Sequence, residues 1–167
     1  MSYFTHAFET QIVSHHVGLY DYMVVFLAPD LISELPLKQY PRLRISGEVG
    51  NIPIEAAWQP VRGRWFLMLS KQLMRDGGFS IGDTVEVRFL VVDQDAVDVP
   101  NELADLLATN ASVRVAWDKL SAGKRRALAH RVSSAKTAPT RARRIAEIAD
   151  AVFNPDYFKP KTRKRTK

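Results

Sequence analysis

The sequence predicts an α+β protein in which a small β-barrel, closed or nearly closed, precedes a helical module. The first observation is a change of period, because hydrophobic residues alternate before Pro100 and recur at helical spacing after it. The second is charge. Residues 1–100 carry 8 Lys and Arg against 12 Asp and Glu, net −4, whereas residues 101–167 carry 16 against 6, net +10. The third is the close spacing of roughly five or six short strands, which is typical of a small barrel. We therefore predict a barrel domain over 1–99, a helical module over 100–153 and a basic disordered tail over 154–167.

The acidic half contains segments with the pattern of a strand or of a short helix. Strands are predicted from β-branched and aromatic content and from alternation, and the short helices from proline and glycine boundaries. The predicted strands are 8–14, 22–27, 43–49, 52–58, 65–69 and 85–91, and the predicted short helices are 29–35 and 70–76. Gly50-Asn51 supplies turn residues between two of the strands, which predicts a hairpin.

Gly82-Asp83 stands immediately before the last predicted strand. The pair resembles the glycine-aspartate box of the cradle-loop barrels. In such a turn the Asp accepts hydrogen bonds from backbone N–H groups, and the Gly adopts a backbone angle that other residues avoid.

The basic half has the apolar spacing of four helices. The apolar stripes are Leu103, Leu106 and Leu107; Val113, Ala116, Trp117 and Leu120; Leu128, Val132 and Ala135; and Ile145, Ile148, Ala149 and Val152. Thr140 is the expected N-cap of the last helix. Arg141, Arg143 and Arg144 then fall in its first turn, where the helix dipole disfavours cations by a few tenths of a kcal/mol each, so another role is expected for them.

The helical half also carries a family pattern. It consists of Ala116-Trp117-Asp118-Lys119-Leu120-Ser121, Lys124-Arg125-Arg126, Ala135-Lys136 and Thr140-Arg141-Ala142-Arg143-Arg144-Ile145. These segments resemble the bacteriocin-protection, YdeI/OmpD-associated family. Members often carry in front a small barrel domain of unknown function, and residues 43–92 are similar to that domain. The resemblance implies a bacterial, cytoplasmic protein without an established reaction, and it supplies no catalytic residues.

Several kinds of chemistry are disfavoured by the composition. The chain has no Cys, which removes disulfides, thiolate metal ligands and a cysteine nucleophile. The start of the chain lacks the pattern of a signal peptide, and the strongest apolar run, 22–28, is too short to cross a bilayer. We therefore expect a cytoplasmic protein that does not insert into a membrane, and no cofactor is predicted.

No catalytic or metal site is predicted either. Gly78-Phe79-Ser80-Ile81-Gly82 satisfies G-x-S-x-G, but a helix precedes the Ser and a strand follows, the reverse of a nucleophile elbow. Adjacent histidines in a strand, such as His15 and His16, point to opposite faces, and nothing completes a ligand set. We expect a protein that is not an enzyme, with an enzymatic barrel kept as an alternative.

The predicted contact surface is basic. Clustered Lys and Arg bind phosphates by releasing counterions, so the basic helical segment is expected to contact an acidic partner such as nucleic acid or an acidic protein. The residues expected to make these contacts are Lys124, Arg125, Arg126, Arg141, Arg143 and Arg144.

The sequence leaves two alternatives open. In the first, Arg62 and Arg64 lie at the mouth of the barrel and bind an anionic small molecule. In the second, the acidic barrel and the basic helices neutralise one another within or between chains. Neither the ligand nor the oligomeric state follows from the sequence.

Overall fold

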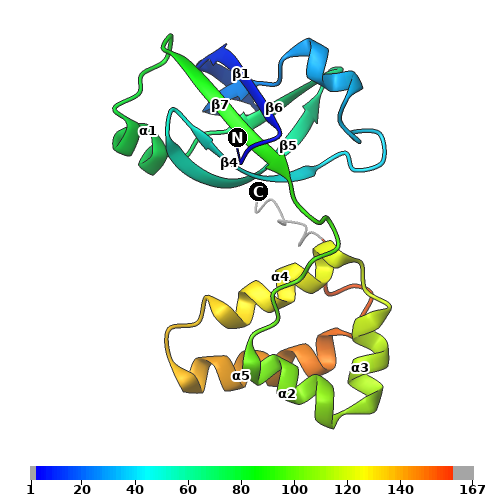
Figure 1. Cartoon of the computed structure of the whole chain (residues 1–167). Coiled ribbons are helices and arrows are strands. Elements are labelled where there is room, and N and C mark those ends of the chain that lie inside the picture. Colours follow the sequence, from blue (N-terminus) through cyan, green and yellow to red (C-terminus); the bar gives the residue numbers. More distant parts are fainter. Residues whose placement is uncertain (1–2, 160–167) are drawn as a thin grey trace, which may run out of the picture. The chain divides into compact units, whose positions relative to one another are not determined.

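The protein consists of two compact units joined near Gln94 (Figure 1). The computed structural model describes residues 3–159. The first unit ends at Gln94 and contains the strands, and the second begins at Asp95 and contains four helices. Strands therefore precede helices along the chain, as predicted for an α+β fold.

The first unit is a curled antiparallel sheet with two short helical segments. Its strands are β1 (His6–Gln11), β2 (Val13–Val17), β3 (Tyr20–Phe26), β4 (Leu43–Val49), β5 (Ile52–Val61), β6 (Arg64–Met68) and β7 (Thr84–Val91). Its helical segments are the 3-10 helix η1 (Pro29–Ser33) and the helix α1 (Lys71–Gly77). The strand order across the sheet is β1-β7-β4-β5-β6-β3-β2, so β1 and β2 form its edges.

The barrel is open, which corrects the prediction of a closed or nearly closed barrel. In the described part of the chain, no backbone ladder joins β1 to β3, although the Thr10 hydroxyl donates to the Phe26 carbonyl at 3.3 Å. The reason lies at Ile12, where the predicted strand 8–14 divides. The Ile12 N–H donates to the Asp83 carbonyl at 2.9 Å and its carbonyl accepts from the Gly82 N–H at 2.8 Å. Because the chain turns at Ile12, β1 pairs with β7 and β2 pairs with β3. The sheet therefore keeps two separate edges, β1 and β2.

The turn before β7 is built as the glycine-aspartate pair predicts. Gly82 has a φ of 98°, in the region that favours glycine. An Asp83 carboxylate oxygen accepts from the Ser80 N–H at 2.8 Å, which closes the turn. The same turn provides the backbone groups that pair with Ile12.

The core of the first unit contains Trp58, Phe89, Leu43, Ile45 and Leu67, all with 1% or less of their surface exposed. Trp58 and Phe89 pack with their ring centroids 5.6 Å apart. These two aromatic side chains therefore serve core packing, because both rings are fully buried.

The second unit is a bundle of four helices. They are α2 (Asn101–Thr109), α3 (Ala111–Asp118), α4 (Ala122–Ser133) and α5 (Ala138–Ala151). Three begin with a side-chain cap that accepts a backbone N–H in the first turn: Asn110 for α3, Ser121 for α4 and Thr137 for α5. The cap of α5 is Thr137 and not the predicted Thr140, because Pro139 is tolerated in the first turn of a helix and does not delay its start.

A separate core holds the four helices together. Leu103, Trp117, Leu128 and Ile148 are buried in it, one from each helix. Val97 and Val99, which precede α2, also pack against this core. For that reason the second unit begins at Asp95, a few residues before the predicted boundary at Pro100.

The first unit ends at Gln94 because that side chain belongs to its sheet. The Gln94 amide bonds to both backbone groups of Arg44, accepting from its N–H at 2.8 Å and donating to its carbonyl at 2.9 Å. The Gln94 amide thus satisfies both backbone groups of a β4 residue, as a neighbouring strand would.

The segment after α5 is more ordered than predicted. Residues 154–159 form turns, and Phe158 packs against the helical core. The cause is the apolar content of this segment, which includes Tyr157 and Phe158. The remainder of the predicted basic tail, residues 160–167, lies outside the described residues.

Candidate binding site of the helical unit

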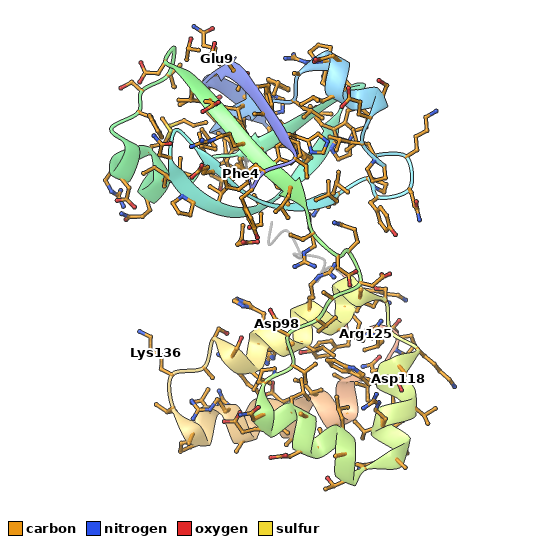
Figure 2. All side chains as sticks on the ribbon, in the orientation of Figure 1. Phe4, Glu9, Asp98, Asp118, Arg125 and Lys136 are labelled. Carbon is orange, nitrogen blue, oxygen red and sulfur yellow. The ribbon has the colours of Figure 1, made fainter. Side chains whose placement is uncertain are left out.

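The six cations predicted to form one surface fall into two groups at opposite ends of α4. Lys124, Arg125 and Arg126 lie in the first turns of α4, whereas Arg141, Arg143 and Arg144 lie at the start of α5, which follows the end of α4. Figure 2 shows this separation, with Arg125 near one end of α4 and Lys136 beyond the other. The 12-residue helix α4 is about 18 Å long, so the two groups do not meet in one patch.

Arg141 and Arg144 are used to join helices inside the unit. Arg144 donates to the Arg131 carbonyl at 2.6 Å and to the Ser134 hydroxyl at 3.2 Å, and Arg141 donates to the Ala135 carbonyl at 3.1 Å. These acceptors lie at or just after the end of α4, where carbonyls have no partner within the helix. The cations that the α5 dipole disfavours therefore stabilise the negative end of α4.

Arg141 also connects α5 to α2. Its Nε donates to a Glu102 carboxylate oxygen at 2.9 Å. Hydrogen bonding to its own backbone N–H, together with the bond from Arg141, lowers the pKa of Glu102 below its ordinary value. Glu102 lies in the first turn of α2, where a carboxylate is favoured by the helix dipole.

Arg143 is the exposed member of the α5 group. Its only carboxylate neighbour in the described part of the chain is Glu147, at 3.9 Å. Glu147 is itself bound to Arg131 of α4, and the hydrogen bond from Arg131 lowers the pKa of Glu147. The same bond raises the pKa of Arg131. Glu147 therefore neutralises part of the positive charge of this region.

The α4 group is only partly available to a partner. Arg126 donates to the Ala96 carbonyl at 3.2 Å, which ties the segment before α2 to α4. Arg125 is half-buried, with its Nε enclosed and without a hydrogen-bond partner among the described residues. It lines a cavity of about 300 Å³ together with Arg114 and Asp118, which pair with each other at 3.0 Å. Asp95 also lines this cavity, so cations and carboxylates balance there and no anion is preferred.

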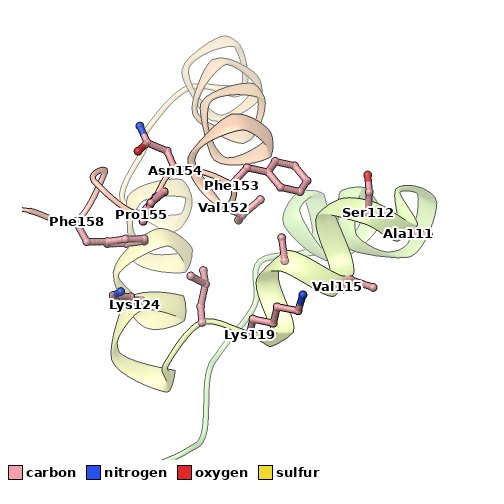
Figure 3. A pocket seen from close by; sticks show the side chains of 12 residues that line it. Ala111, Ser112, Val115, Lys119, Lys124, Val152, Phe153, Asn154, Pro155 and Phe158 are labelled. Carbon is pink, nitrogen blue, oxygen red and sulfur yellow. The ribbon is translucent and has the colours of Figure 1, made fainter.

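Lys124 is exposed and belongs to a different feature, an open apolar groove of about 720 Å³. Figure 3 shows the groove, which α3, the start of α4, the end of α5 and the segment 152–158 enclose. The described residues that line it are Ala111, Ser112, Val115, Ala116, Lys119, Leu120, Lys124, Val152, Phe153, Asn154, Pro155 and Phe158. We call this feature the α3–α5 groove.

Two lysines mark one side of the α3–α5 groove. Lys119 caps the end of α3, and Lys124 follows in the first turn of α4, so both flank the turn between these helices. The Lys124 ammonium lies 5.1 Å from the centre of the Phe158 ring, a cation–π contact that holds it at the groove edge. Neither lysine has a carboxylate within ion-pair distance in residues 3–159, and no carboxylate is among the described residues that line the groove.

Sequence reasoning missed the groove because it took apolar residues as core. Val115 lies off the buried stripe of α3 and is 55% exposed, and Phe153 follows the end of α5 and is 56% exposed. An apolar residue outside the stripe was the available clue. Lys119 lacked any such clue, since it stands outside the basic segment Lys124-Arg125-Arg126.

The two arginines proposed for the barrel lie on either side of the turn between β5 and β6. Arg62 adopts a positive φ of 46°, and the Arg64 guanidinium lies 3.5 Å from the centre of the Phe26 ring. His15 and Phe66 complete this aromatic cluster. Neither arginine lines the α3–α5 groove or the cavity beside Arg125.

Other chemistry has little support in the described residues. His6 stacks on Phe89, His15 contacts Phe66, and His16 pairs with Asp21. Residues 3–159 contain no group of three or more metal-ligating side chains. No helix in that range is long and apolar enough to cross a membrane.

The fold and the groove define an open strand-rich unit followed by a four-helix unit with an exposed apolar surface. Residues 96–153 match the family described as "Bacteriocin-protection, YdeI or OmpD-Associated", so the predicted resemblance is confirmed for these residues. The match covers the helices, including the α3 and α5 walls of the groove up to Phe153. A search of curated proteins finds no match.

Proposed function

We propose that the protein is a non-enzymatic binding protein whose helical unit contacts an acidic protein. One observation carries this proposal: Lys119 and Lys124 both line an exposed apolar groove that no described carboxylate lines. Two exposed ammonium groups that pair with no carboxylate among the described residues attract the carboxylates of a partner. Covering the apolar surface between the helices is favourable, because it removes that surface from water.

The placement of the other cations supports an acidic protein more than nucleic acid. A phosphate backbone is bound by many cations spread along a surface, and each contact adds to the salt dependence. Here Arg141 and Arg144 donate to the end of α4 and Arg126 to Ala96, which reduces the number of free cations. A nucleic acid would also leave the apolar groove uncovered, since its exterior is polar and charged.

The first prediction compares two double variants that each remove two positive charges. Lys119→Ala/Lys124→Ala changes the groove rim, and Lys136→Ala/Arg143→Ala changes exposed cations at the far end of α4. We expect the full chain to bind fluorescent polyglutamate at about 50 mM salt and to bind it more weakly at about 200 mM. The rim variant should bind about tenfold more weakly, a loss of about 1.4 kcal/mol, whereas the far variant should change little.

Fluorescence anisotropy gives the affinities, and a mixed-sequence DNA duplex serves as the competing probe. Binding to neither probe would exclude an acidic partner, as would affinity that does not respond to salt. If DNA binds more tightly than polyglutamate and both double variants weaken it equally, the partner is nucleic acid and contacts are spread over the whole helical unit.

A further inference from the structure

We infer that the α3–α5 groove binds an amphipathic helix that carries carboxylates along one flank of its apolar stripe. This inference rests on the proposed function, since the same two lysines contact the partner in both. It adds the secondary structure of the bound segment and the contacts that give specificity.

The walls of the groove indicate side-chain packing as the means of recognition. All sides described are helices or the turn segment after α5, and no strand edge borders the groove. A partner therefore cannot add a strand to this unit, because that mode requires unpaired backbone groups of a sheet edge. The mode that remains for an apolar groove between helices is an amphipathic helix laid into it.

The size of the side chains along α3 allows a helix to approach closely. Ala111, Ser112 and Ala116 present small side chains to the groove. Phe153 stands at the opposite wall, at the end of α5, and Figure 3 shows its ring directed toward α3. Small residues facing a large one leave room for the apolar residues of a helix, which recur at i, i+3, i+4 and i+7.

The charges set the orientation of the partner about its own axis. Lys119 and Lys124 both flank the turn from α3 to α4, whereas uncharged Asn154 and Pro155 line another part of the groove. A helix with Glu on one flank places its carboxylates toward the lysines and avoids burying charge elsewhere. This asymmetry distinguishes the expected partner from a uniformly acidic segment.

The openness of the groove favours a polypeptide over an enclosed small molecule. Val115 and Phe153 line it while more than half exposed, at 55% and 56%. Small-molecule sites bury most of the ligand surface inside a cavity, whereas a helix covers an exposed apolar strip from outside. Covering both residues removes apolar surface from water.

The test uses the full chain and three labelled synthetic peptides of about 16 residues, long enough for about four helical turns. The first has Leu at helical spacing with Glu along one flank. The second has the same composition in scrambled order, and the third has Gln in place of every Glu. We expect the first to bind at least about tenfold more tightly than either control and to gain helicity on binding, seen by circular dichroism.

Variants of the protein locate the contact. Val115→Gln should weaken binding of the first peptide by about tenfold, because it places an amide in the apolar lining of the groove. Ile81→Gln is the matched control, since Ile81 is 58% exposed and lies in the other unit. It should bind as the unaltered chain does. Both sites are exposed, so neither substitution should unfold the protein.

Each other outcome overturns the inference. Equal affinity for the ordered and scrambled peptides would exclude a helical partner. Binding of polyglutamate would then still support the proposed function. Saturable binding of dodecanoate that Val115→Gln abolishes, without preference for the ordered peptide, assigns the groove to an anionic amphiphile. Tighter peptide binding by at least about tenfold in a chain ending at Lys159 assigns it to the chain's own C-terminal segment. If the full chain binds neither polyglutamate nor any of the peptides, both the inference and the proposed function are wrong.

Discussion

At the scale of single residues, positive charge in this protein serves two purposes that the sequence does not separate. Arg144 donates to carbonyl and hydroxyl groups at the end of α4, whereas Lys124 lies exposed at the groove edge. A helix end needs donors for its last carbonyls, and arginine supplies several from one side chain. A count of cations therefore overstates the charge that a partner meets.

The pair formed by Arg131 and Glu147 predicts how stability depends on pH. Because the hydrogen bond from Arg131 lowers the pKa of Glu147 in the folded protein, the pair contributes stability above the unfolded pKa of about 4.5. That contribution is lost as the pH falls through the lowered folded pKa. Glu147→Gln should lower the unfolding temperature at neutral pH, and the difference from the unaltered chain should shrink on acidification, measured by circular dichroism.

Asp150→Asn is the control for this experiment. It makes the same change of charge on α5, and Asp150 has no ion pair among the described residues. Its unfolding temperature should stay close to that of the unaltered chain at every pH. A gap for Glu147→Gln that stays constant from neutral to acid pH would show that the Arg131 pair does not stabilise the fold.

At the scale of elements, the approach of β4 to β7 depends on the absence of a side chain at Gly47. A Cβ at this position would lie 2.3 Å from the Arg88 carbonyl oxygen and 2.8 Å from the Phe89 Cβ. Gly47 pairs with Phe89 in the ladder, so neither strand can move without breaking backbone hydrogen bonds. Gly47→Ala should destabilise the first unit by about 1–3 kcal/mol, measured by urea unfolding.

Gly123→Ala provides the comparison, because a Cβ at Gly123 meets nothing within 4 Å. Since glycine costs up to about 1 kcal/mol relative to alanine in a helix, this change should leave stability unaltered or raise it. Equal destabilisation by both substitutions would mean that the close approach of β4 and β7 is not what Gly47 provides.

The elements themselves were predictable wherever local chemistry and period agree. Alternation located the strands from 43–49 to 85–91, and the apolar stripes located four helices. The break at Ile12 was not predictable, because an apolar β-branched residue continues a strand pattern and its partners lie in the distant turn at Gly82-Asp83. The start of α5 was missed because Thr137 and Thr140 are equally good caps by composition.

The candidate site was less predictable than the fold. Lys124 was expected to bind a partner, but the groove that it lines was not, because its apolar walls at Val115 and Phe153 come together only through the packing of α3 against the end of α5. Sequence order also placed Arg141 and Arg144 with Lys124 in one surface, although α4 separates them. Which cations meet depends on tertiary packing, and no local pattern reports it.

At the scale of the whole molecule, the two units have separate hydrophobic cores. The core around Trp58 and Phe89 contains residues of the first unit, and the core around Trp117 and Ile148 contains residues of the second. Their boundary follows contacts on each side, with Gln94 bound to Arg44 and Val97 packed on the helices. Each unit therefore has the apolar burial that a small domain needs to fold by itself.

This separation predicts that a chain ending at Gln94 folds without the helices. We expect it to unfold cooperatively in urea, with the midpoint found for the first unit in the full chain, because none of its core residues is removed. A chain ending at Asp93 is the matched control and should be less stable, since it loses the Gln94 amide that bonds to both backbone groups of Arg44. If the chain ending at Gln94 aggregates or unfolds without cooperativity, the acidic unit depends on the basic one for its stability. The positive charge of the helices would then bind the acidic unit and not an external partner.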